Sequence, residues 1–430
     1  MLSKNCHHQL SDIIDEIAIR RGQVIDGRDQ HILDAETRIF EIRRVRLIIR
    51  VILTLTAVLL SITLVTAQDS ANSPSALRVI GKNLVDSRSA PVRLRGVNTA
   101  SLEWTSDGEG HILETVRVAL EDWKVNHVRL PLSQDRWFGK APEQSDGGRS
   151  YRALVRQIID NCSSQGVYVM PELHWSNGGQ WGQTIGQHAM PDLHSVTFWK
   201  DFATKYKNHP AVIFDLYNEP HGVSWDIWRD GGEVTERLPR GGGEHTYQAV
   251  GMQTLLDAVR STGARNVTVI AGLDWSYDLS GILEHGPLHD PLGNGLLYAN
   301  HAYPFKGDTV DAWIEKMVRA SRHLPLIISE FGSETHPQDR VGPQMDAPDQ
   351  AGMILNQAGM TDLDWVEAVL DAIEKNGWHW TAWNLHPAAG PRLISDWEYT
   401  PTPHFGVPVK RFLLSNGSPL RSGKLTRPDR

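Results

Sequence analysis

Short apolar runs alternate with longer amphipathic segments along the chain from Leu77 to Leu413. The short runs are nearly continuous, as is typical of strands buried on both faces of a parallel sheet. They predict eight strands: Val92–Asn98, Asn126–Leu132, Val167–His174, Val212–Asn218, Val267–Leu273, Leu296–His301, Pro325–Glu330 and Trp378–Asn384. A period of three to four residues predicts six helices between them: Ile112–Trp123, Tyr151–Ser164, Ser195–Lys207, His245–Thr262, Thr309–Arg322 and Asp362–Lys375. Two shorter helices are expected near Tyr277–Leu283 and His404–Leu413. Eight strand-and-helix units predict an α/β fold, a (β/α)8 TIM barrel.

The barrel is predicted to form a single domain over residues 77–415, after a linker over 68–76 and before a polar tail over 416–430. A short hairpin is expected in Leu77–Val92, where it would close the bottom of the barrel. Three loops that are rich in glycine, proline and aspartate follow the second, fourth and seventh strands: Gly139–Ser150, Arg229–Glu244 and Glu334–Met360. Loops after the strands build the active site of such barrels, so these loops are expected to border it.

Residues 47–67 are predicted to direct the chain to a membrane. The uncharged apolar run over 51–67 follows a basic stretch that contains Arg43 and Arg50. This length fits a signal peptide cleaved after Ala67, which we favour, or a retained signal anchor. The basic flank stays inside, so the expected location is secreted, extracellular or periplasmic, or membrane-anchored with the catalytic domain outside. The polar extension over 1–46 is either cytoplasmic or the result of a misassigned translation start.

Charge and cysteine content exclude several classes of protein. The net charge is −8 over 430 residues, so no nucleic acid is expected as a partner, and a membrane only through the N-terminal segment. The two cysteines, Cys6 and Cys162, exclude a disulfide framework and a zinc site built from several cysteines. Cys162 is expected in the core. All 15 tryptophans lie at or after Trp104, which predicts a surface that stacks against a flat ligand.

Polar residues at the ends of the predicted strands would meet in one cavity. Glu219 and Glu330 directly follow the apolar runs of the fourth and seventh strands, where a solvated surface glutamate is not expected. Arg129 and Tyr303 are available to hold one carboxyl group ionised, and that charge would keep the pKa of the other high. Two carboxyl groups in a cavity that contains tryptophan suit glycoside hydrolysis, in which one protonates the leaving oxygen and the other attacks or activates water.

Seven short strings lie in chain order on these strands. They are Leu94-Arg95-Gly96-Val97-Asn98, Val128-Arg129-Leu130-Pro131, Leu173-His174-Trp175, Tyr217-Asn218-Glu219-Pro220-His221, His301-Ala302-Tyr303, Ser329-Glu330-Phe331-Gly332 and Ala382-Trp383-Asn384. Together they resemble glycoside hydrolase family 5, the cellulase A family of retaining (β/α)8 hydrolases. The resemblance covers residues 77 to 413.

This resemblance implies a retaining hydrolase of β-linked glucan that works by double displacement, without a metal or other cofactor. It implies that Glu330 is the nucleophile and Glu219 the acid/base, that Asn218 binds the sugar 2-hydroxyl, and that Arg129 and Tyr303 hold the Glu330 carboxylate. An endo-β-1,4-glucanase is the first expectation. A β-mannanase or an exo-β-1,3-glucanase with the same catalytic pair remains an alternative, and the chain is expected to be a monomer.

The same resemblance implies that His174 and His301 line the cleavage subsite and that Trp383 forms the floor under the sugar. Trp175 and Trp181, in the polar loop after the third strand, are the favoured candidates for stacking on sugar faces. Weaker candidates are Trp104, Trp137, Trp225, Trp228 and Trp275.

Two other functional classes stay open. A barrel that binds glycans without cleaving them is disfavoured by the intact glutamate pair. A metal-dependent, amidohydrolase-type barrel would need several histidines near the ends of the first, fifth and sixth strands, and only the sixth has one. Glu172 and His174 with His188 and His194 could form a metal site, but their spacing matches no standard ligand pattern. Asp215 is expected to point into the helix layer or to pair locally.

Overall fold

The computed structural model describes residues 73–238, 242–335 and 355–415. The chain divides after Ala71, and the unit that begins at Asn72 holds all the described residues. The predicted extension (1–46), the leader (47–67), residues 68–72 of the linker and the tail (416–430) lie outside the described residues. Within the described ranges, no helix is long and apolar enough to cross a membrane.

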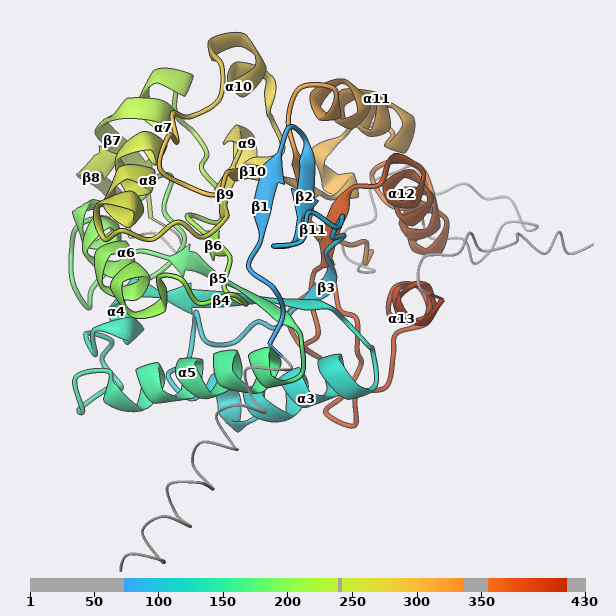
Figure 1. The fold of residues 1–430 in the computed structure, drawn as a ribbon, viewed down its shortest axis with the longest axis horizontal. Coiled ribbons are helices and arrows are strands. Elements are labelled where there is room, and N and C mark those ends of the chain that lie inside the picture. Colours follow the sequence, from blue (N-terminus) through green and yellow to red (C-terminus); the bar gives the residue numbers. More distant parts are fainter. Residues whose placement is uncertain (1–72, 239–241, 336–354, 416–430) are drawn as a thin grey trace, which may run out of the picture. The chain divides into compact units, whose positions relative to one another are not determined.

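Eight parallel strands close into a barrel, as the apolar runs predict (Figure 1). Around the barrel they are β3 (Arg95–Asn98), β4 (His127–Ser133), β5 (Tyr168–Trp175), β6 (Phe214–Asp215), β9 (Thr268–Ala271), β10 (Leu296–Ala302), β11 (Leu326–Phe331) and β12 (His379–Ala382). Every residue of β4 and β11 is buried, which fits strands covered on both faces. The predicted TIM barrel is confirmed, although β6 is much shorter than the run over Val212–Asn218 suggests.

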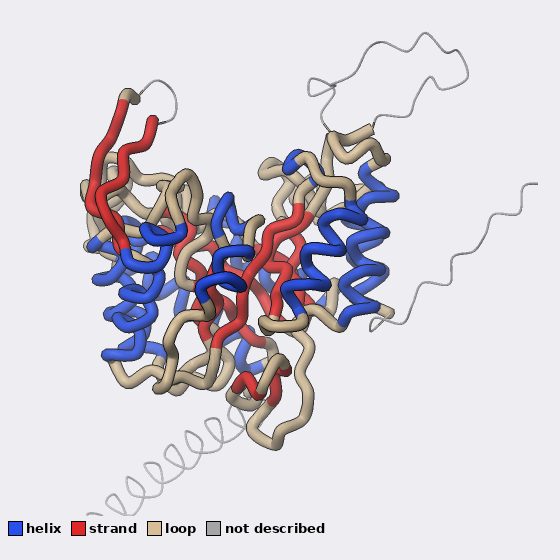
Figure 2. Tube along the Cα trace, turned by 90° about the horizontal axis from the view of Figure 1, so that it is seen from above, coloured by secondary structure: helices blue, strands red, loops and turns tan. Residues whose placement is uncertain are grey.

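Helices pack around the outside of the strands (Figure 2). The longer ones are α3 (Ile112–Glu121), α5 (Arg149–Ser164), α6 (Leu193–Tyr206), α8 (Met252–Ser261), α11 (Val310–Ser321), α12 (Asp362–Asn376) and α13 (Gly406–Leu414). Short helices after the strands are η1 (Gly108–Gly110), α4 (Gln134–Trp137), α7 (Trp225–Asp230), α9 (Leu273–Ser276), α10 (Ser280–His285) and η3 (Pro304–Lys306). Several helices begin at a side-chain cap. Thr309 accepts a hydrogen bond from the Ala312 amide at the start of α11, for example.

The predicted N-terminal hairpin is confirmed and consists of β1 (Arg78–Ile80) and β2 (Asn83–Val85). Its buried Leu84 packs with the first residues of the barrel strands, among them Tyr168 and Leu297. The hairpin therefore covers the amino end of the barrel, opposite the strand ends that carry the polar residues.

A second hairpin replaces the loop predicted over Arg229–Glu244 and the first turns of the helix predicted over His245–Thr262. Its strands are β7 (Gly231–Arg237) and β8 (Glu244–Val250), and α8 begins only at Met252. Along β8, His245, Tyr247 and Ala249 are buried and alternate with exposed residues. This period of two marks a strand, so the helix prediction over this part was wrong.

More tryptophans lie in the hydrophobic core than the predicted sugar-stacking surface would suggest. Nine of the 15 are buried: Trp123, Trp137, Trp199, Trp228, Trp313, Trp365, Trp378, Trp380 and Trp383. Trp137 and Trp228, which were candidates for stacking on sugar, are 0% and 1% exposed and pack between barrel and helices. Cys162 is buried in the same core, as expected.

Candidate active site

Arg129, on β4, is the centre of a buried polar network at the carboxyl ends of the strands. Its Nη1 donates to Glu330 Oε1 at 2.6 Å, its Nε to Asp215 Oδ2 at 2.8 Å and its Nη2 to Asn218 Oδ1 at 2.9 Å. Burial alone would lower the pKa of Arg129, but Glu172, Asp215 and Glu330 around it outweigh burial and raise it. The guanidinium is therefore a fixed positive charge that holds side chains from three other strands in place.

Glu330 lies near the end of β11 and accepts hydrogen bonds on both carboxylate oxygens. Arg129 donates to Oε1, and the Tyr303 hydroxyl donates to Oε2 at 2.6 Å. Burial and then the charge of Glu330 raise the pKa of Tyr303 well above its usual value, so this hydroxyl keeps its proton and remains a donor. These two donors fix the position and direction of the carboxyl group, as a nucleophile requires.

Glu219 lies just beyond β6 in a different environment. Its Oε1 accepts from His301 Nδ1 at 2.8 Å and its Oε2 from the Gln187 amide at 2.5 Å. Burial raises the pKa of Glu219 above its usual value, and the hydrogen bond from Gln187 opposes this. Burial also lowers the pKa of His301 to about 3, so the imidazole is neutral and donates through Nδ1. A carboxyl group with a raised pKa is suited to carry a proton to a substrate.

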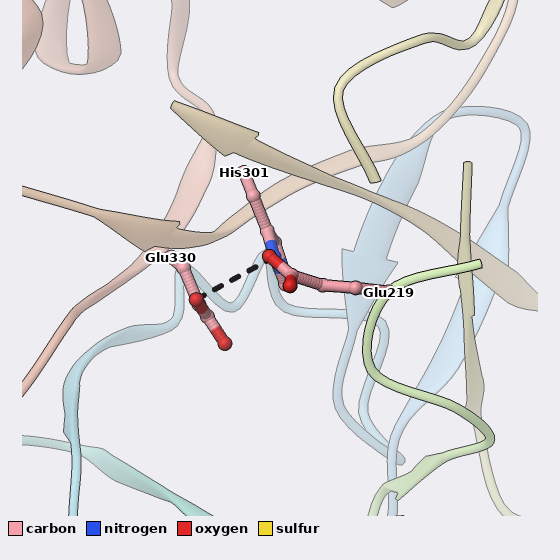
Figure 3. Close-up of side chains that lie close together, drawn as sticks. All are labelled: Glu219, His301 and Glu330. Atoms are coloured by element: carbon pink, nitrogen blue, oxygen red, sulfur yellow. Dashed lines mark hydrogen bonds and ion pairs between the residues drawn. The ribbon is translucent and has the colours of Figure 1, made fainter. Parts of the chain in front are cut away.

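The two carboxyl groups face each other across His301 (Figure 3). One oxygen of each, together with a ring nitrogen of His301, lie within 4.8 Å of one another. His301 Nδ1 is 3.5 Å from Glu330 Oε2. This closeness fits retaining glycosidases, whose carboxyl groups lie about 5–5.5 Å apart, better than inverting enzymes, which hold a water between groups about 6.5–9.5 Å apart.

A divalent cation is a poor occupant of this site. All four oxygens of Glu219 and Glu330 already accept hydrogen bonds, and Arg129 places a positive charge against one of them. We assign no metal to it. The four residues weighed as metal ligands from the sequence do not form one cluster. Glu172 and His174 contact each other, but His188 pairs with Glu236, and His194 stacks on Trp181 with ring centroids 3.8 Å apart.

His174, on β5, contacts both the Arg129 network and Trp383, the residue expected beneath the sugar ring. Its Nδ1 contacts Glu172 Oε2 at 2.9 Å and its Nε2 lies 3.3 Å from Asn218 Nδ2. Its ring also stacks on Trp383, with centroids 5.3 Å apart and planes 17° apart. Burial lowers the pKa of His174 and raises that of Glu172. Asn218 is thus held by Arg129 on one side and by His174 on the other.

The two tryptophans favoured for stacking differ in position. Trp175 is half-buried at the end of β5 and lines a cavity of about 940 Å³ together with Gln187 and His221, which both contact Glu219. Trp181 stacks on His194 and packs edge-on against Phe138, and it is not among the residues that line this cavity.

Asp215 was placed wrongly by sequence reasoning. It lies inside the barrel, 1% exposed, and binds Arg129 rather than the helix layer or a neighbour in the chain. Burial raises its pKa to about 7, against the pull of Arg129. Sequence reasoning also missed Gln187 and Asn98, which contact Glu219 and Arg129. Gln187 lies in a loop with no recognisable pattern, whereas Asn98 could have been found at the end of the first strand.

Comparison with known proteins identifies the family that the sequence matches. The model of the family described as Cellulase (glycosyl hydrolase family 5) matches residues 85–389. Endoglucanase E-5 of Thermobifida fusca is 23% identical over 316 residues, which are 72% of this chain and 55% of the relative. Endoglucanase MaCel5A of Microbulbifer sp. (strain ALW1) is 24% identical over 72% of this chain and 50% of the relative, so the chain spans about half the length of these relatives.

Solved structures share the fold. The β-glucanase SdGluc5_26A from Saccharophagus degradans, solved with cellotetraose, matches with a TM-score of 0.59 at 20% identity over 80% of this chain and 95% of that one. The catalytic domain of Thermobifida fusca endoglucanase Cel5A matches with a TM-score of 0.53 at 19% identity, over 79% of this chain and 97% of that one.

Proposed function

Because the chain belongs to the cellulase family, glycosyl hydrolase family 5, we propose that it is a retaining endo-β-1,4-glucanase. The observation that carries the proposal is the pair Glu219 and Glu330, whose oxygens lie within 4.8 Å in contrasting environments. The endoglucanases among its relatives support β-1,4-linked glucan as the substrate.

In the first step, an oxygen of Glu330 attacks the anomeric carbon of the sugar. The bond from that carbon to the leaving oxygen breaks, and Glu219 gives this oxygen its proton. Arg129 and Tyr303 aim the attacking carboxylate, and Asn218 is placed to bind the sugar 2-hydroxyl. Trp383 supplies the apolar surface beneath the ring.

In the second step, the covalent ester with Glu330 has no charge. The pKa of Glu219 therefore falls, and its carboxylate takes a proton from water as the water oxygen attacks the anomeric carbon. The bond to Glu330 breaks and the configuration of the sugar is retained. Neutral His301 donates a hydrogen bond to Glu219, and this donor is available when the Glu219 carboxylate carries its charge.

A substrate panel tests this function. Carboxymethylcellulose, barley glucan, mannan and laminarin are incubated with the enzyme, with and without a chelator, and both viscosity and reducing ends are measured. We expect a rapid fall in viscosity on cellulose and barley glucan that the chelator does not affect, and NMR should detect the β-anomer first. Preference for mannan or laminarin would identify one of the alternative activities. Loss of activity with the chelator would contradict the metal-free mechanism. Binding of glucan without turnover would indicate a barrel that binds glycans and does not cleave them.

We further propose that the leader over 47–67 exports the catalytic domain. The apolar run over 51–67 and its basic flank support this proposal. Mass spectrometry of the mature protein should find Gln68 as the first residue. An intact leader in the membrane fraction, with a domain open to external protease, would instead indicate an anchor, and activity confined to the cytoplasm would contradict export.

A further inference from the structure

The loop before α6 contacts the proposed acid/base directly. Gln187 Nε2 donates to Glu219 Oε2 at 2.5 Å, and this is the contact that neither a strand end nor a family string predicts. Gln187 also lines the cavity of about 940 Å³ described above, and it contacts the oxygen of Glu219 that His301 does not. One oxygen of Glu219 therefore depends on this loop for its position.

The loop itself is tied to the β7–β8 hairpin next to Gln187. Glu236, on β7, accepts hydrogen bonds from His188 Nδ1 and, at 2.8 Å, from the Ala189 amide. His188 Nε2 contacts the Thr184 carbonyl oxygen as well. Both ring nitrogens thus face acceptors, and only the protonated imidazolium can donate through both. Burial would lower the pKa of His188, but Glu236 and the Thr184 carbonyl raise it overall.

We propose that Gln187 is a positioning residue for the acid/base carboxyl of Glu219, and that the ion pair between His188 and Glu236 holds Gln187 in place from the hairpin. The proposal rests on the proposed function of Glu219. It assigns the hairpin a part in the reaction, in addition to lining the cavity with Val234–Arg237.

The sign of the expected pH effect follows from the contacts of Glu219. A donor to a carboxylate favours the charged form, so Gln187 lowers the pKa that burial raises. The other titratable or charged groups around Glu219 remain in the variant: Arg129, Glu172, His174, His221, His301, Tyr303 and Glu330. Removing only the amide should therefore raise the pKa of Glu219.

The test is Gln187→Met, which keeps the side-chain length and removes the donor, measured on aryl cellobiosides. With a poor leaving group, kcat/KM should fall about tenfold, while a dinitrophenyl leaving group, which needs no acid, should lose less than about twofold. The alkaline limb of the kcat/KM profile should move up by about one pH unit. Gln180→Met is the matched control, since Gln180 is an exposed glutamine of the same loop and is not among the residues that line the cavity, and it should change neither quantity.

A second pair of variants tests the hairpin. In Glu236→Ala, kcat/KM should again fall more for the poor leaving group than for dinitrophenyl, although less than in Gln187→Met. Glu233→Gln, at an exposed position of the same strand, should leave both values unchanged. Equal losses for both leaving groups, or an alkaline limb that does not move in folded Gln187→Met, would overturn the proposal. Glu219→Ala distinguishes the proposed function from the positioning role of Gln187. If azide does not restore turnover in Glu219→Ala, the proposed function is wrong. If azide restores it and Gln187→Met behaves as the wild type, only the positioning role is wrong.

Discussion

At the scale of single residues, the two glutamates of the site have different neighbours. Glu330 receives one hydrogen bond from the charged guanidinium of Arg129 and one from the Tyr303 hydroxyl. Glu219 receives only neutral donors, His301 and Gln187, and burial raises its pKa. These different neighbours support the proposed assignment of Glu330 as the nucleophile and Glu219 as the acid.

Replacing Glu330 with Gln should abolish formation of the covalent intermediate, because the amide is not a nucleophile. We expect kcat to fall by at least about 10⁴-fold. The fold and substrate binding should survive, which circular dichroism and calorimetry with cellotetraose can measure. Appreciable turnover in the variant would mean that another group attacks the sugar.

Glu219→Ala should behave differently because an activated leaving group needs no acid in the first step. The second step then lacks its base and becomes limiting, so a covalent intermediate accumulates. Azide attacks without a base and should restore turnover with a β-glycosyl azide as product. Recovery of the α-azide would show that the two roles are assigned the wrong way round.

His379, on β12, should make stability depend on acid pH. Its Nδ1 accepts from the Leu94 amide at 3.1 Å, and burial lowers its pKa to about 4. The unfolded chain binds a proton near pH 6.5, so the stability due to neutral His379 is present above pH 6.5 and is lost as the pH falls toward 4. Relative to His379→Gln, which keeps an acceptor and does not titrate, the wild type should lose about 3 kcal/mol of unfolding free energy over this range. Urea titrations from pH 8 to 4 measure the difference, and parallel curves would contradict it.

Sequence reasoning at this scale is reliable where position along a strand determines direction. Glu219 and Glu330 could be found because each ends a buried run at the same rim of the barrel. Gln187 could not, since its contact with Glu219 depends on how a loop without regular structure folds across 32 residues. Asp215 was placed wrongly because the sequence does not show that Arg129, 86 residues away, would meet it inside the barrel.

At the scale of elements, the β7–β8 hairpin is the main departure from eight plain strand-and-helix units. It is joined to the loop before α6 through the backbone N–H and C=O groups of Met190. The Tyr247 hydroxyl accepts from Met190 N and donates to Met190 O, each at 2.9 Å. His245 Nε2 also contacts the Gly178 carbonyl, and a Cβ on Gly178 would come within 2.5 Å of that nitrogen.

Tyr247→Phe keeps the ring and leaves both Met190 groups without their partner. Buried polar groups that lose a partner are costly, so we expect a loss of about 2 kcal/mol in unfolding free energy. Amide hydrogen exchange in β8 should also become faster. Thr246→Val, on the exposed face of the same strand, should cost less than about 0.5 kcal/mol. Equal effects of the two variants would argue against the anchoring role of Tyr247.

The barrel strands could be predicted because burial on both faces leaves an unbroken apolar run. β8 was missed for a related reason: its apolar residues lead directly into those of α8, and one continuous helix accounts for both segments. The period of two over His245–Ala249 is only a few residues long, too short to stand out against the longer helical pattern that follows.

At the scale of the whole molecule, stability and chemistry are separated along the barrel axis. Leu84 of the lower hairpin is 1% exposed and packs with Leu94, Met170 and Ile327 near the amino ends of the strands. The Arg129 network occupies the opposite ends and keeps several carboxyl groups buried around one cation. Active sites of TIM barrels lie at the carboxyl face, whereas the amino face contributes mainly to stability.

Leu84→Ala should therefore change stability and leave catalysis intact. Removing a buried leucine side chain leaves a cavity, for which we expect a loss of about 3 kcal/mol in unfolding free energy. At temperatures where the variant is folded, its kcat and KM on barley glucan should match the wild type. Glu330→Gln supplies the reverse case, with activity lost and the thermal midpoint unchanged or raised. A fall in kcat for folded Leu84→Ala would show that the lower hairpin is coupled to the site across the whole barrel, contrary to the separation that the packing indicates.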